Sequence, residues 1–214
     1  MTPIKAIIWD MDGVLVDSEE MHVQAEAVTL KHYGIDLKFE DIGDFMGMRL
    51  RDYFKALGEH FGVDLPIDEL MDHHVKNLEI YYGEKFPPVP NVKETLEKLA
   101  PNYKMALATS MEHKMANIYL KRMEIESYFQ VVIGGNDVQN GKPDPEVFAI
   151  AAQKLGVTPE ESVVVEDATN GIKAGKAAGC TVIARSAHHN AEQDLSLADH
   201  IIKDLLEIPV YLAS

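Results

Sequence analysis

The sequence predicts an α/β protein in which a parallel sheet is interrupted by an inserted helical segment, and three observations support this. A short apolar run, Ile4 to Trp9, is typical of a buried strand. From Asn91 onward, apolar strands alternate with helices of about ten residues, which is the pattern of βαβ units. Between them, from about 17 to 86, the chain has helical periodicity and no convincing strand.

Two carboxylates follow the first strand. We expect that strand at 4–10, so that Asp10 and Asp12 project from its carboxyl end, and Gly13 then allows a tight turn. In open α/β sheets this edge binds ligands. A carboxylate pair there can hold a divalent cation, or can divide the roles of nucleophile and proton donor. A simple acidic turn after a strand is the alternative interpretation.

The inserted stretch is expected to be helical. Apolar spacing predicts helices at 18–33, 49–62 and 67–82, with a short helical piece at 40–46. Ser18 is expected to cap the first helix, while Gly34 and Gly62 follow helix ends. Because the insertion follows the first strand, it lies over the carboxyl edge, and we interpret it as a lid.

The remaining elements alternate. Asn91 with Glu94 predicts a capping box, and Asp144 and Thr158, each followed by proline, predict two further helix starts. The expected strands are 104–109, 131–133, 162–166, 180–184 and an edge strand at 201–202. The expected helices are 91–99, 112–123, 145–155 and 168–178.

The composition excludes several classes of partner. The 214 residues carry 20 basic and 35 acidic side chains, a net charge of −15 that repels nucleic acid and anionic lipid. A phosphate site therefore needs a local metal ion, lysine or N–H groups. The single cysteine, Cys180, is compatible with a reducing cytosol and is expected to be buried. With no signal peptide and no run of membrane length, we expect a cytoplasmic monomer that binds no membrane.

Hydroxyl and ammonium groups occur at two further points of the same edge. Thr109 and Ser110 end the second strand, where a hydroxyl can donate to a phosphate oxygen or cap the next helix. Lys142 lies in a loop stiffened by two prolines and followed by a helix start. It is either a fixed charge suited to phosphate or a solvated loop lysine.

Two acidic residues, Glu166 and Asp167, end the strand at 162–166. Burial of these two carboxylates costs free energy unless a cation or hydrogen-bond donors pair with them. With Asp10 they would supply the hard oxygen ligands that magnesium prefers. The convergence of all these groups on one edge predicts a catalytic site.

The order of the motifs Asp-x-Asp-Gly-Val, strand-end Thr, Gly-Lys-Pro-Asp-Pro and Glu-Asp resembles the haloacid dehalogenase-like hydrolase superfamily. The resemblance covers essentially the whole chain. It implies a Rossmann-like core at 1–16 and 87–214, a mobile α-helical cap domain at 17–86, and phosphoryl transfer that depends on Mg²⁺. Asp167 would bind the metal, with Glu166 in its first or second coordination shell.

The resemblance also implies catalytic roles. Asp10 would be the nucleophile and a metal ligand. Asp12 would be the general acid and base, with its backbone carbonyl touching the metal, and it argues against the true dehalogenases, which lack this aspartate. Thr109 and Lys142 would hold the phosphoryl group. An ionised carboxylate needs no base to attack phosphorus, which agrees with these roles.

The expected substrate-binding residues are Ser110 and three cap residues. His22 resembles the proton-relay histidine of β-phosphoglucomutase, and Lys76 a substrate-binding cap lysine. The loop at 46–51, with Arg49, resembles the cap's substrate loop, but its arginines are out of register with the mutase's phosphate-binding arginine. We therefore favour a phosphatase acting on a small phosphorylated metabolite, a sugar or polyol phosphate. A phosphosugar mutase and a non-catalytic metal- or phosphate-binding protein are the alternatives.

Two histidine pairs, His73–His74 and His188–His189, have no spacing typical of a zinc site. Adjacent residues on a helix do not face each other. We expect these side chains to be solvated.

Overall fold

A six-stranded sheet forms the centre of the computed structural model, which describes residues 2–38, 41, 45–82 and 87–213. The strand order is β3-β2-β1-β4-β5-β6, and every neighbouring pair is parallel. The strands are β1 Ala6–Trp9, β2 Lys104–Ala108, β3 Val131–Ile133, β4 Ser162–Glu166, β5 Thr181–Arg185 and β6 His200–Ile202. The predicted parallel α/β architecture is confirmed, with β6 at an edge as expected.

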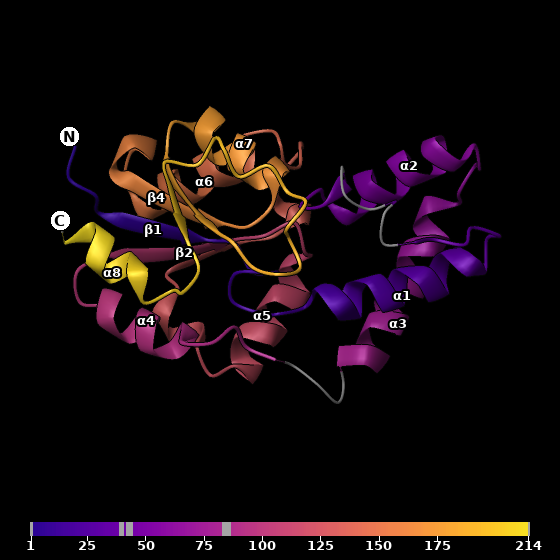
Figure 1. Ribbon diagram of the computed structural model, residues 1–214, viewed down its shortest axis with the longest axis horizontal. Coiled ribbons are helices and arrows are strands. Elements are labelled where there is room, and N and C mark those ends of the chain that lie inside the picture. The colour runs from indigo at the N-terminus through magenta and orange to yellow at the C-terminus, as the bar shows by residue number, and fades with distance from the viewer. Residues whose placement is uncertain (1, 39–40, 42–44, 83–86, 214) are drawn as a thin grey trace.

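Helices cover both faces of the sheet because successive strand residues point to opposite sides. Ile7 and Trp9 pack toward α4, α5 and α8, whereas Ala6 and Ile8 pack toward α6 and α7 (Figure 1). These helices are α4 Val92–Leu99, α5 His113–Arg122, α6 Glu146–Leu155, α7 Thr169–Ala178 and α8 Glu207–Leu212. In the described part of the chain, short 3₁₀ helices also connect elements: η3 Glu126–Tyr128, η4 Gly135–Asp137 and η5 Pro159–Glu161.

The inserted segment forms a helical cap beside the sheet (Figure 1). Its helices are α1 Glu19–Lys31, α2 Leu50–Phe61 and α3 Ile67–Tyr82. They enclose their own apolar cluster around Leu30, Phe54, Leu57 and Leu70. The inserted cap domain of the predicted fold class is therefore confirmed.

The chain enters and leaves the cap along two adjacent segments. The N–H of Asp17 donates to the carbonyl of Pro87 at 2.9 Å, and the N–H of Val89 donates to that of Leu15 at 2.9 Å. This paired connection agrees with one insertion. Its boundaries at 17 and 86 stay a prediction, since residue 86 lies outside the described residues, as does most of the expected helical piece at 40–46.

Two of the predicted helix N-caps are wrong. Ser18 precedes α1, but its backbone (φ −99°, ψ −10°) is not in the extended conformation typical of a capping residue, and its hydroxyl donates to Asp12 Oδ1 at 2.6 Å. Asn91 forms no capping box: its backbone is left-handed (φ 66°), and its amide donates to the carboxylate of Asp204. By contrast, the capping signal at Thr158 is confirmed.

The interior holds the residues expected there. Trp9 is fully buried and Cys180 is 3% exposed, as predicted. Among the described residues, no helix combines the length and the apolarity that a membrane span requires.

Candidate active site

The carboxyl ends of the central strands and the cap enclose a cavity of ≈ 240 Å³. Asp10 follows β1, Thr109 follows β2, and Asp167 follows β4. The cavity is lined by predicted site residues of both core and cap: Asp10, Asp12, His22, Arg49, Thr109, Ser110, Lys142 and Asp167. Eight of the ten side chains that the sequence singled out therefore line one cavity.

Lys142 bridges two carboxylates beneath this cavity. Its Nζ donates to Asp10 Oδ1 and to Glu166 Oε1, both at 2.6 Å. The residue is 3% exposed, so the alternative of a solvated loop lysine is wrong. Burial lowers the pKa of Lys142, but the charges of Asp10 and Glu166 outweigh burial and raise it above its usual value. Lys142 is thus a permanent cation at neutral pH.

Asp10 belongs to a buried acidic cluster with Glu166 and Asp167. Carboxylate oxygens of the three residues lie within 4.8 Å of one another. Burial raises the pKa of Asp10 well above its usual value. The charge of Lys142 opposes this rise, while Glu166 and Asp12 add to it. Three carboxylates beside one lysine leave an excess of negative charge, which a divalent cation would offset. The cluster can hold a metal ion.

Glu166 is fixed within this cluster but does not line the cavity. One oxygen accepts from Lys142, and the other accepts from the backbone N–H groups of Asp167 and Ala168 at 2.7 and 2.9 Å. The carboxylate is 1% exposed, and donors surround it. Glu166 therefore orients Lys142 and the loop that carries Asp167.

The turn after β1 requires glycine at position 13. Gly13 has φ +71°, and a Cβ there would lie 2.0 Å from Asp167 Oδ2. A larger residue would therefore displace the carboxylate from the cavity. The Gly13 carbonyl also accepts from Arg185 Nη1 at 2.6 Å, which ties the turn to the end of β5.

Asp12 links the core to the cap. Its Oδ1 accepts from Ser18 Oγ at 2.6 Å and lies 3.1 Å from His22 Nε2, at the start of α1. Burial raises the pKa of Asp12, but the charge of His22 and the hydrogen bonds from His22 and Ser18 outweigh it, so the net shift is downward. Asp12 and His22 together form a short path along which one proton can move.

The two strand-end hydroxyls do not cap the next helix, because α5 begins at His113 with Glu112 before it. Thr109 is 1% exposed, and its Oγ1 accepts from the N–H of Met111 at 3.2 Å. Ser110 Oγ instead donates to the carbonyl of Gly47 in the cap at 2.8 Å. The alternative that these hydroxyls cap the next helix is therefore wrong. Both side chains line the cavity.

The expected cap residues differ in their positions. Arg49 lines the cavity, yet its guanidinium pairs with Asp52 and donates to the carbonyls of Val138 and Gln139 in the core, both at 3.2 Å. Lys76 is exposed on α3 and is not among the residues around the cavity. The structure thus brings Arg49 to the site as a link between cap and core, and it does not bring Lys76 there.

His189 is a site residue that the sequence analysis missed. We expected it to be solvated, but its Nε2 hydrogen-bonds Asp167 Oδ2 at 2.8 Å, and its neighbour Asn190 donates to the Asp167 carbonyl at 2.8 Å. Both residues follow β5, so the rule that polar groups gather at carboxyl strand ends could have found them. His188 is exposed, as predicted.

The other histidine pair also departs from expectation. His74 is fully buried within the cap, so the prediction of a solvated side chain is wrong there. Its neighbour His73 is partly buried and hydrogen-bonds Tyr33. Neighbouring residues on a helix point in different directions, so α3 buries His74 while His73 stays partly exposed. The sequence of the pair does not indicate which of the two is buried.

Residues 7–185 match the sequence profile of a family described as haloacid dehalogenase-like hydrolase. The chain belongs to this family. The hydrolase is 33% identical over 186 residues to the phosphorylated carbohydrates phosphatase of Thermotoga maritima, with 86% of each chain covered. It is 31% identical over 230 residues to the phosphoglycolate phosphatase of Escherichia coli K12, which covers 95% of this chain and 91% of the relative.

A solved structure gives a further comparison. A candidate β-phosphoglucomutase from Thermotoga maritima aligns with a TM-score of 0.70 at 29% identity, over 98% of this chain and 99% of that chain. The expectation from the motifs, an enzyme of this superfamily, is confirmed.

Proposed function

We propose that this hydrolase is a magnesium-dependent phosphatase that cleaves a small phosphorylated metabolite, a sugar or polyol phosphate, through an aspartyl-phosphate on Asp10. The observation that carries the proposal is the buried Asp10 carboxylate at the cavity, 2.6 Å from the permanent cation Lys142 and beside the Asp12–His22 pair. The two curated relatives are named as phosphatases of a carbohydrate phosphate and of a phosphorylated acid. Their names support a small phosphate ester as substrate.

The side chains can carry both half-reactions. A carboxylate oxygen of Asp10 attacks phosphorus, and the bond from phosphorus to the leaving oxygen breaks while the proton held by the Asp12–His22 pair passes through Asp12 to that oxygen. Asp12 then takes a proton from a water molecule that attacks the aspartyl-phosphate, which releases phosphate and restores Asp10. Lys142 and the Thr109 hydroxyl hold the phosphoryl oxygens in position.

The oxygen donors of the site fit magnesium. Asp10, Asp167 and the backbone carbonyl of Asp12 would hold the ion, with Glu166 beside them, and all four offer hard oxygen ligands. When bound, Mg²⁺ reduces the repulsion between an anionic nucleophile and an anionic phosphoryl group.

The expected monomer and the cytoplasmic location stay predictions.

A mutase is the second candidate, favoured by the hydrogen bond between His22 and Asp12 and by the likeness to the candidate β-phosphoglucomutase. In that case the phospho-aspartate would return its phosphoryl group to a sugar. Conversion of β-glucose 1-phosphate to glucose 6-phosphate, primed with the bisphosphate, would show mutase activity. Release of phosphate without such conversion would support the phosphatase.

The proposal is tested by phosphate release from p-nitrophenyl phosphate and a panel of sugar and polyol phosphates. Asp10→Asn should lower kcat at least about a thousandfold, whereas Asp36→Asn, at an exposed cap position, should not. Chelation should abolish turnover and Mg²⁺ restore it. Mass spectrometry after trapping should place the phosphoryl group on Asp10. Turnover retained by the Asp10 variant would refute the mechanism. Absence of turnover over the panel, with magnesium still bound, would favour a non-catalytic binding protein.

A further inference from the structure

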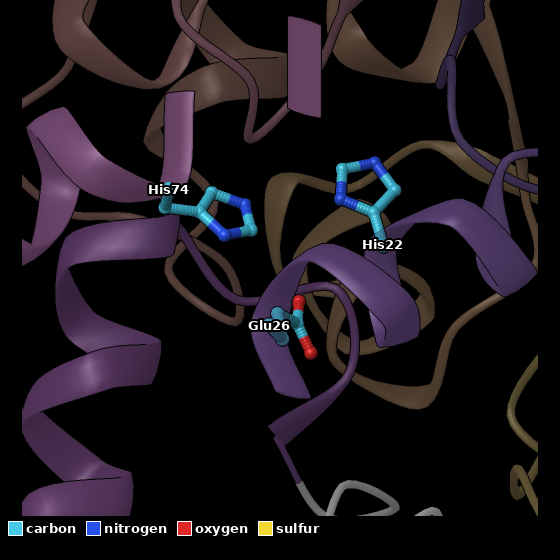
Figure 2. A group of neighbouring side chains, drawn as sticks. All are labelled: His22, Glu26 and His74. Atoms are coloured by element: carbon cyan, nitrogen blue, oxygen red, sulfur yellow. The ribbon is translucent and has the colours of Figure 1, made fainter. Parts of the chain in front are cut away.

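A second group of potential metal ligands lies inside the cap. His22 and Glu26 are one turn apart on α1, and His74 faces them from α3 (Figure 2). One ligand atom from each residue lies within 4.8 Å of the other two. The group differs from the acidic cluster in its chemistry, because two imidazoles and one carboxylate supply mixed nitrogen and oxygen donors.

His74 carries the strongest indication of a ligand. The residue is fully buried, and neither ring nitrogen has a hydrogen-bond partner in the part of the chain that the structure describes. A buried polar group without a partner costs about 1–3 kcal/mol. Burial, and secondarily the charge of His22, lower the pKa of His74 to about 3, so that its ring is neutral at physiological pH. A neutral, unpartnered imidazole is the form that binds metals.

The other two side chains are oriented by groups on their far sides. His22 Nε2 contacts Asp12, and Figure 2 shows the rings of His22 and His74 turned toward each other with the Glu26 carboxylate nearby. Tyr53 donates its hydroxyl to Glu26 Oε2 at 2.6 Å. Supporting partners of this kind, a carboxylate behind a histidine and a donor on a carboxylate, are typical of metal sites.

We propose that His22, Glu26 and His74 bind a zinc ion. Two histidines and one glutamate are a ligand set that zinc accepts while one coordination position remains for water or another molecule. Magnesium, which prefers oxygen ligands, would favour the acidic cluster instead. His22 and Glu26 also line the cavity, so the ion can reach the site from there.

The test is a direct binding measurement on the full chain in excess Mg²⁺, which on the proposed function would occupy the acidic cluster. Zinc titration against a chelating indicator should find one ion in the wild type. Glu26→Gln and His74→Gln should each weaken its binding beyond the roughly 10–100-fold that loss of a supporting partner costs. His73→Gln, one position away on α3, should leave the affinity unchanged. Cobalt substitution should give the visible absorption of a nitrogen-ligated ion in the wild type.

Controls separate the two metal sites and the effect of misfolding. Circular dichroism checks each variant, and Glu26→Gln keeps the side-chain size and the hydrogen bond from Tyr53. Asp167→Asn should retain the zinc. The proposal is overturned when the wild type takes up no zinc in excess Mg²⁺. It is also overturned when Glu26→Gln and His74→Gln bind zinc as tightly as His73→Gln, or when Asp167→Asn alone loses the ion.

Discussion

At the scale of single residues, Lys142 lies between the carboxylates of Asp10 and Glu166. Without its positive charge these two buried groups would repel each other. Both pairs have N–O distances of 2.6 Å, and all three side chains are under 10% exposed. Charges buried in this way are balanced only as a set, because removal of one partner leaves the others without compensation.

Replacement of this lysine tests the balance. Lys142→Met should lower the free energy of unfolding by about 3–5 kcal/mol in chelator, because Asp10 and Glu166 lose their shared cation. Turnover should also fall sharply. Urea denaturation measures the first effect, and Lys154→Met, at an exposed position of α6, is the matched control. Equal stabilities of the two variants would contradict this account of the site.

His189 orients the carboxylate of Asp167 through a hydrogen bond of 2.8 Å. His189→Ala should raise the Mg²⁺ concentration for half-maximal activity by about 10–100-fold, since an unsupported ligand binds metal less well. Saturating Mg²⁺ should recover most of kcat. His188→Ala provides the control, as that side chain is exposed. The interpretation fails if both variants require the same Mg²⁺ concentration as the wild type.

At the scale of elements, the short segment 46–49 before α2 connects cap and core. The carbonyl of Gly47 accepts from Ser110, the carbonyl of Met46 accepts from Asn170 at 2.9 Å, and Arg49 donates to two core carbonyls. This segment closes the cavity from the cap side. The position of the cap over the site depends on its close approach to the core.

Gly47 permits that approach. A Cβ at this position would lie 2.9 Å from the Cβ of Ala168, and the residue has φ +76°. Gly47→Ala should therefore hinder closure and lower kcat/KM about tenfold or more, because the cap helps to position the substrate. Steady-state kinetics over a range of substrate concentrations measure the effect.

Gly34 offers the matched control for this change. It has a similar φ of +81°, but a Cβ there would meet nothing within 4 Å. Gly34→Ala carries the same backbone strain, about 1–2 kcal/mol of stability, without the steric contact. Its kcat/KM should equal that of the wild type. A similar kinetic loss in both variants would show that strain in the cap, and not contact with the core, is responsible.

At the scale of the whole molecule, the cap has an apolar cluster of its own, and the fully buried His74 packs against Phe54 of that cluster. His74 has a pKa near 6.5 in the unfolded chain and about 3 in the fold. Between these values the unfolded chain binds more protons than the folded one. The free energy of unfolding therefore falls as the pH drops below about 6.5, and it is unaffected by this residue above that pH.

His74→Gln should remove this contribution. Between pH 6 and about pH 4, the wild type in chelator should lose up to about 1.4 kcal/mol per pH unit more than the variant, because one proton is involved. Urea denaturation at several pH values gives the two slopes. His73→Gln should retain the wild-type slope. Parallel slopes for His74→Gln and the wild type would mean that the buried ring does not control acid stability.

The sequence by itself determined the fold class and the core of the candidate site. The period-2 and period-3.6 patterns predicted the strands and the helices α1 to α7 to within a few residues, but they missed α8. Strand-end chemistry predicted the carboxyl edge at which Asp10, Thr109, Lys142 and Asp167 meet. This succeeds because parallel strands end at one edge, so that position along each strand already fixes position in space.

Only the tertiary structure decided which groups pair across that edge. Ser18 bonds Asp12 instead of capping α1, His189 supports Asp167, and His74 is buried beside His22 and Glu26. The periodic pattern of apolar residues does not indicate these contacts, because they join different segments of the chain. Their partners follow from the packing of helices and loops against the sheet, where burial makes an unpaired polar group costly and so selects the nearest acceptor or ligand.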